Sequence, residues 1–147
     1  MIRRDIVEKI GFPDSRYFIY WDDTTYGYLA SKVTNPIVVP DIILRRTRDI
    51  PNWDIAGVRQ LNSTSDINRY HIMRNRGFMA RYFMVHGDFR PFMFALGTAL
   101  TAAKEIIRLI AVDREHIISG IGKLFTGWID SRKILHDQDW KPMPSLK

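Results

Sequence analysis

The chain has 147 residues, no cysteine, and a formal net charge of +6 from 22 Lys plus Arg against 16 Asp plus Glu. This length fits one medium-sized domain, and the absence of cysteine excludes a disulfide scaffold, a thiolate zinc site and a cysteine nucleophile. With 46% hydrophobic residues, the chain can build a core, which excludes intrinsic disorder. We expect a soluble or membrane-surface domain.

The sequence of the first third of the chain predicts short helices and short strands. Residues 2–10 place apolar side chains on one helical face and end at Gly11, which predicts a short helix. The aromatic run 17–21 is too short for a helix and rich in strand formers, so it predicts a short buried strand. A helix over 25–32 and a strand over 37–39 complete this part.

The rest of the chain predicts a loop followed by three helices. Residues 40–65 are polar without a sustained period and predict a loop with short pieces of strand. Helices are predicted over 66–86, which is strongly cationic, and over 91–112, which is mostly apolar. A last helix over 115–133 carries one apolar stripe, formed by Ile117, Ile118, Ile121, Leu124, Phe125, Trp128 and Ile129.

The predicted fold class is α+β and mainly helical. Residues 1–62 hold the few short strands, residues 63–136 form a helical, membrane-proximal region, and residues 137–147 form a frayed tail. A sheet of two or three strands is marginal alone, so the helices must cover it. We also expect an apolar edge to remain exposed and to promote self-association.

Neither a membrane-spanning helix nor a secretion signal is predicted. The longest charge-free run, 91–103, has 13 residues, whereas a spanning helix needs about 18 or more. Charges at Arg3 and Arg4 come too early for the apolar region of a signal peptide. We expect a cytoplasmic protein, peripheral on the inner face of the cell membrane. The basic excess fits an anionic membrane, a nucleotide diphosphate or a nucleic acid equally.

Two adjacent carboxylates, Asp22 and Asp23, follow the aromatic run and are the most informative feature. At a turn into a helix the two side chains point in different directions, so one can bond helix amides while the other faces a cleft. A carboxylate against Trp21 and Tyr26 would be partly desolvated, which makes it a better general base toward a sugar hydroxyl. Helix capping is the commoner role for such residues.

The chain resembles the acceptor-site segment of inverting family 2 glycosyltransferases, in particular the galactofuranosyl- and rhamnosyl-transferase branch. The matching pieces, in chain order, are 9–14 (KIGFPD), 17–27 (YFIYWDDTTYG), a strand ending at Pro40, and Tyr70, Arg74 and Asn75 of a later helix. The resemblance covers roughly residues 1–85. It implies the C-terminal remnant of a GT-A-type fold, followed by a helical tail.

The resemblance also implies roles for single residues. Asp23 would be the catalytic base that deprotonates the attacking hydroxyl, and Trp21, Asp22 and Tyr26 would bind the acceptor sugar. The metal-binding Asp-x-Asp and the nucleotide-binding half of the family precede this segment. We therefore expect a partner chain with the donor-binding half, and an inactive chain without it, because transfer needs donor and acceptor held together.

The resemblance further implies a nucleotide-sugar donor and a divalent metal, Mg or Mn. The position of the family's histidine ligand falls on Arg46, which cannot coordinate a cation, so Arg45 or Arg46 would contact the diphosphate instead. A metal site built from the chain's own histidines is not expected. Their positions share no two-ligand spacing: His71, His86, His116 and His136.

The predicted function is therefore transfer of a sugar from a nucleotide-sugar to a glycan or lipid-linked acceptor in cell-surface polysaccharide synthesis. The alternative is a non-enzymatic basic module whose helices over 91–112 and 115–133 bind an anionic membrane or a partner protein. A nucleic-acid partner is less favoured, because the aromatic residues of 66–86 follow a helical spacing typical of a core. The sequence leaves open whether the chain is an enzyme.

Overall fold

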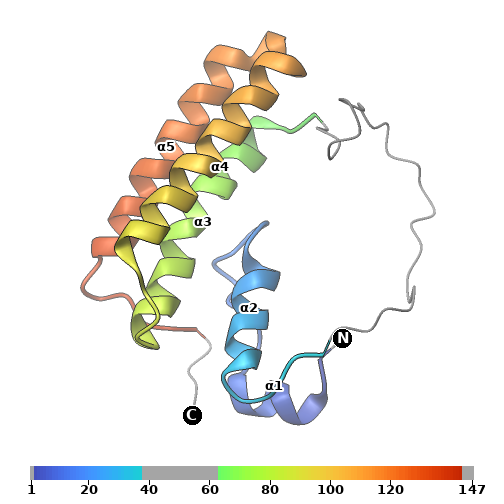
Figure 1. The fold of residues 1–147 in the computed structure, drawn as a ribbon, viewed down its shortest axis with the longest axis vertical. Helices are drawn as coiled ribbons and strands as arrows, with labels where there is room; N and C mark the ends of the chain where they lie inside the picture. Colours follow the sequence, from blue (N-terminus) through green and yellow to red (C-terminus); the bar gives the residue numbers. More distant parts are fainter. Residues whose placement is uncertain (1, 38–62, 144–147) are drawn as a thin grey trace, which may run out of the picture.

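The computed structural model describes residues 2–37 and 63–143, and the regular elements among these residues are all helices, without a strand. The helices, in chain order, are α1 (Arg4–Ile10), α2 (Asp22–Ser31), α3 (Asp66–Val85), α4 (Pro91–Ala111), the 3-10 turn η1 (Arg114–His116) and α5 (Ile117–His136). Figure 1 shows α3, α4 and α5 side by side, with α1 and α2 lying beside the C-terminal half of α3.

Helix α3 is the centre of the fold. Ser65 caps its N-terminus, since the Ser65 hydroxyl accepts a hydrogen bond from the Asn68 backbone N–H at 3.3 Å. The helix ends before Gly87, whose φ of +73° is a left-handed conformation that glycine adopts without strain. Most of its middle turns are buried, because α5 packs along one side and side chains of α1 and α2 cover Phe78 and Tyr82 on another.

Helices α3 and α5 pack with their backbones in direct contact. A Cβ atom added to Gly77 of α3 would lie 2.6 Å from the Ser131 carbonyl oxygen of α5. A Cβ added to Gly127 of α5 would collide with the Tyr70 carbonyl oxygen of α3. Small residues at these crossing points therefore permit the close approach, and α5 buries a face that includes Gly120, Gly127 and Ser131.

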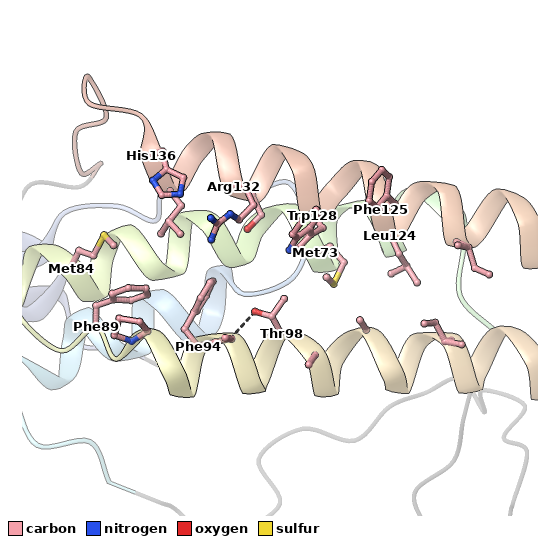
Figure 2. Close-up of a pocket in the computed structure, with 18 residues that line it drawn as sticks. Met73, Met84, Phe89, Phe94, Thr98, Leu124, Phe125, Trp128, Arg132 and His136 are labelled. Atoms are coloured by element: carbon pink, nitrogen blue, oxygen red, sulfur yellow. Dashed lines mark hydrogen bonds between the residues drawn. The ribbon is translucent and has the colours of Figure 1, made fainter.

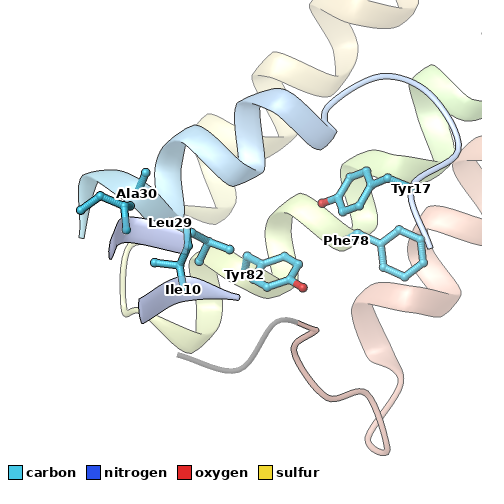
Figure 3. Packing of buried hydrophobic residues seen from close by; sticks show 7 residues of the cluster. Ile10, Tyr17, Leu29, Ala30, Phe78 and Tyr82 are labelled. Atoms are coloured by element: carbon cyan, nitrogen blue, oxygen red, sulfur yellow. The ribbon is translucent and has the colours of Figure 1, made fainter. Parts of the chain in front are cut away.

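The main hydrophobic core joins α1, α2 and α3. Figure 3 shows Ile10 of α1 and Leu29 of α2 packed around Tyr82 of α3, and Tyr17 beside Phe78. The two rings of this last pair have centroids 5.4 Å apart. A smaller core of Met73, Leu109 and Leu124 joins the three long helices. The N-terminal elements are thus anchored on α3.

The predicted α+β fold, and with it the remnant of a GT-A sheet, is wrong for the described residues. Residues 17 and 18 are irregular and residues 19–21 form a bend, because no neighbouring strand among the described residues offers them backbone hydrogen bonds. Side chains of α3 bind their carbonyl groups instead. Helix α2 also begins three residues before the predicted start at Thr25. The predicted strand over 37–39 lies, apart from Ile37, outside the described residues.

The long helices agree with the sequence pattern, but the apolar stripe of α5 does not form the core. Leu124 is buried, whereas Ile118 is 89% exposed and Phe125 is 59% exposed. The buried face of α5 is the one that carries its small residues. Within the described residues, none of the helices combines the length and hydropathy needed to cross a bilayer.

Candidate functional site

The carboxylate pair stands at the first turn of α2. Asp22 and Asp23 are its first two residues, and both are exposed. The backbone N–H groups of a first helical turn lack partners within the helix, so this position favours negative charge and ligand oxygens. The pair is thus presented to solvent at an electropositive helix end.

The turn before α2 has an unusual backbone. Tyr20 and Trp21 both have left-handed conformations, with φ of +67° and +68°. Asn75 of α3 holds this turn, because its side-chain amide donates to the Ile19 carbonyl at 2.7 Å and to the Tyr20 carbonyl at 3.2 Å. The Trp21 indole N–H donates to the Ile72 carbonyl at 2.9 Å. Helix α3 therefore fixes the direction in which α2 begins.

Two arginines of α3 reinforce this connection. Arg74 donates to the Arg16 carbonyl at 3.2 Å. The Arg76 guanidinium lies between two aromatic rings, 5.4 Å from the centroid of Trp21 and 5.2 Å from that of Phe94 in α4. The Arg-Asn signature of the sequence, Arg74 and Asn75, thus contacts the segment that precedes the carboxylate pair.

The two carboxylates have different surroundings. One oxygen of Asp23 accepts from the Thr24 backbone N–H at 2.7 Å and from the Thr24 hydroxyl at 3.3 Å. Asp22 has no hydrogen-bond partner among the described residues and lines a cavity of about 10 Å³. This cavity has room for about one water molecule, so a sugar must approach the pair from the solvent side.

The polar groups of the two predicted acceptor-binding aromatic residues have partners within the protein. The Tyr26 hydroxyl donates to the Gly11 carbonyl at 2.6 Å, and the Trp21 indole N–H is held by α3. These residues therefore position the turn, and their rings alone remain for contact with a sugar. Arg45 and Arg46, the predicted diphosphate contacts, lie outside the described residues.

A buried polar cluster that the sequence did not suggest lies on the inner side of Asp22. The Asp14 carboxylate accepts from the Arg16 guanidinium at 2.6 Å and from the Tyr82 hydroxyl at 2.9 Å. Burial and the charge of Asp14 raise the pKa of Tyr82 above its usual value. Asp14 and Tyr82 are 68 residues apart in the chain. Only the fold brings them together, so no sequence signal was available.

The arginines of the cationic helix bond mostly within the protein. Arg69 is fully buried and forms ion pairs with Asp66, at 2.9 Å, and with Asp113. Arg76 donates to the Thr98 hydroxyl of α4 at 2.9 Å. Arg81 donates to two backbone carbonyls of the C-terminal segment. These side chains connect the helices of the fold and do not form an open cationic surface.

The residues that the structure describes offer no group of three or more His, Asp or Glu side chains able to hold a metal ion. Arg46, which occupies the position of the family's histidine ligand, lies outside the described residues. We therefore assign no step of a reaction to a metal bound by these residues.

A second feature is an apolar groove of about 800 Å³ between α4 and α5, with Met73 of α3 at its base. Figure 2 shows Phe94 and Thr98 of α4 facing Trp128 and Arg132 of α5 across this space. The sequence predicted an apolar stripe on α5 but not that α4 would leave it uncovered. The groove lies on the opposite side of α3 from the core of α1 and α2.

Searches with this chain against protein-family models, curated proteins and solved structures found no match.

Proposed function

We propose that this chain forms the acceptor-site region of an inverting sugar transferase, with Asp23 as the general base. One observation carries the proposal: α3 holds two residues in left-handed conformations, and α2 consequently starts with an exposed carboxylate pair. Such conformations cost on the order of 1–3 kcal/mol each and concentrate at functional sites. Helix capping by itself does not require left-handed residues before the helix. Ser65, for example, caps α3 from an extended backbone conformation.

The reaction follows from the position of Asp23. One carboxylate oxygen is bound by Thr24, which fixes the side chain, and the other is free to accept a proton from an acceptor hydroxyl. The deprotonated oxygen attacks the anomeric carbon of the donor sugar, and the bond to the nucleotide diphosphate breaks on the opposite face. The proton stays on Asp23, and the product has the inverted configuration. The proposal takes the donor-binding half from outside residues 1–147, in keeping with the family resemblance.

Asp22, Trp21 and Tyr26 have supporting roles in this proposal. The free Asp22 carboxylate accepts hydrogen bonds from acceptor hydroxyls, while the two aromatic residues keep the turn in place through their bonds to α3 and Gly11. A glycan or a lipid-linked sugar are both suitable acceptors. A lipid-linked acceptor agrees with a location on the inner face of the cell membrane, which is part of this proposal. The large exposed apolar side chains of α4 and α5 support that location.

Sugar transfer by membranes of the source organism tests the role of Asp23. Membranes that contain Asp23→Asn protein are expected to transfer sugar from a radiolabelled nucleotide-sugar to the endogenous acceptor about 10²–10⁴-fold more slowly, because the amide cannot accept the proton. Asp5→Asn is the matched control, since Asp5 is also an acid in the first turn of a helix.

The control is expected to retain transfer within twofold. Circular dichroism and immunoblotting check that both variants fold and accumulate like the parent protein. Normal transfer by the Asp23→Asn protein would remove Asp23 from the mechanism and the carboxylate pair from the active site.

A further inference from the structure

The groove between α4 and α5 is long. Its α4 lining runs from Pro91 to Ile106, which is about 22 Å at 1.5 Å per residue. Its volume of about 800 Å³ lies within the range of small-molecule sites, about 300–1,000 Å³. The lining is almost entirely apolar, and it includes alanines on α4 and larger side chains such as Leu124, Phe125 and Trp128 on α5. This shape suits an extended hydrocarbon chain better than a compact ring.

The basic side chains of the groove lie toward one end. Arg132 and His136 lie one turn apart on α5 and both line the groove. No carboxylate lines it among the described residues. The acids on α4 and α5 already have partners, as Glu105 pairs with Arg108 at 2.7 Å and Asp130 pairs with Lys133 at 2.9 Å. The groove thus combines an apolar channel with a cationic end.

The surface around the groove is apolar as well. Phe92 is 74% exposed, and other large apolar side chains continue along the outer faces of α4 and α5: Met93, Leu96, Leu100, Ile107, Ile110, Ile118, Ile121 and Phe125. Soluble monomers rarely expose contiguous apolar patches larger than a few hundred Å². An apolar helical surface on a basic protein is typical of proteins that lie in a membrane interface, and Lys104 of α4 is an exposed cation on the same helix.

We infer that the groove between α4 and α5 binds one acyl chain of an anionic membrane phospholipid, with Arg132 at its phosphate. The apolar channel takes the chain, and the guanidinium of Arg132 donates hydrogen bonds to the phosphate oxygens. His136 contributes a second polar contact at the same end. The inference shares with the proposed function only the location at the membrane.

A second copy of this chain is a poorer occupant. In a symmetric dimer the same surface faces itself, so Arg132 and Lys104 would meet only groups that this surface itself carries. No unpaired carboxylate on the described parts of α4 and α5 is available to compensate them. An anionic bilayer supplies the opposite charge together with the apolar chain.

Binding of a single-chain lipid tests the inference without any measurement of sugar transfer. The probe is 16-carbon lyso-phosphatidylglycerol below its micelle concentration, and the readout is native mass spectrometry of the full chain together with quenching of Trp128 by a brominated acyl chain. We expect one lipid per protein, with at least tenfold weaker binding of lyso-phosphatidylcholine, which has no net charge.

Two variants change the groove, and each has a matched control. Arg132→Gln is expected to weaken binding about tenfold or more, because it removes a charged donor to the phosphate. Its control is Lys123→Gln, which removes a cation of α5 outside the groove and is expected to change the lipid affinity less than twofold. Ala99→Phe fills the channel and is expected to weaken binding at least tenfold, whereas Ala103→Phe, on the outer side of α4, leaves it unchanged.

Three results would overturn the inference. The first is a failure to bind one lipid saturably. Equal lipid binding by the parent, Arg132→Gln and Ala99→Phe proteins counts as the same result, provided that circular dichroism shows all three to be folded. The second is a dimer in sedimentation velocity that Ala99→Phe dissociates, which assigns the groove to a second copy. The third is displacement of the lipid by a polyprenyl phosphate at a hundredfold lower concentration, which assigns the groove to an acceptor carrier.

Discussion

At the scale of single residues, Asn75 has the largest influence on the candidate site. Its amide is completely buried and donates to two consecutive carbonyl groups of the turn before α2. The amide oxygen of Asn75 has no partner among the described residues. A buried polar group with an unmet hydrogen bond is costly, so the two donor bonds must offset that cost and the strain of Tyr20 and Trp21.

Replacing Asn75 by Leu should therefore release the turn. We expect the free energy of unfolding to fall by about 1–3 kcal/mol, because two partly buried carbonyl groups lose their donors. Urea unfolding followed by circular dichroism measures this change, and two-dimensional NMR detects movement of the amides of Asp22 and Asp23. Asn68→Ala is the control on the same helix, since no hydrogen bond of the Asn68 side chain is seen in the described part of the chain. An unchanged urea midpoint for Asn75→Leu would show that the turn does not depend on this amide.

At the scale of elements, the sequence predicted the long helices and failed on the short aromatic segment. The helices over 66–86 and 91–112 were predictable because apolar spacing, a serine cap and a first-turn proline agree. Strand propensity of residues 17–21 measures only the fit to a half-buried sheet, and no sheet is present beside them in the described residues. Contacts with α3, distant in the chain, decide their conformation.

The contact between α3 and α5 gives a prediction with an internal control. A methyl group at Gly127 would collide with the Tyr70 carbonyl of α3, whereas one at Gly122 on the same helix meets nothing within 4 Å. We expect Gly127→Ala to lower the free energy of unfolding by about 1–3 kcal/mol through overpacking. Gly122→Ala should raise it by up to about 1 kcal/mol, because alanine favours a helix more than glycine does.

Thermal and urea unfolding of the two alanine variants measure these changes. Equal stability of the variants would mean that the helices separate at little cost, and that the close backbone contact does not hold α3 and α5 together.

At the scale of the whole molecule, the sequence showed which faces are apolar but not what covers them. The α5 stripe was visible in the sequence, yet the fold buries the small residues around Gly127 and leaves Phe125 at the groove. The position of Asp22 and Asp23 at a helix start was predictable from local signals, since acids favour first turns. The groove, the turn held by Asn75 and the Asp14 cluster depend on contacts between distant segments, which one sequence does not reveal.

The ion pair between Arg69 and Asp113 shows how such distant contacts hold the molecule together. It joins the first turn of α3 to the connection between α4 and α5, and both side chains are buried. Burial alone would raise the pKa of Asp113. Hydrogen bonds from the Ser63 side chain and the Thr64 backbone N–H, together with the charge of Arg69, outweigh this effect and lower the pKa below its usual value.

Asp113→Ala should therefore be strongly destabilising and should alter the response to acid. It leaves Arg69 buried without this partner, so we expect the free energy of unfolding to fall by about 3–5 kcal/mol at pH 7. The control is Glu8→Ala, which breaks an exposed ion pair on α1 and should lower it by at most about 1 kcal/mol. Because the pKa of Asp113 is lower in the folded state, its contribution is complete above about pH 4, the usual range of a carboxyl group, and decreases as the pH falls further. Urea unfolding between pH 7 and pH 2 measures the difference in free energy of unfolding between the parent protein and Asp113→Ala. This difference should decrease only at the acid end of the range. A constant difference across that range would mean that the Asp113 carboxylate contributes through packing and not through its charge.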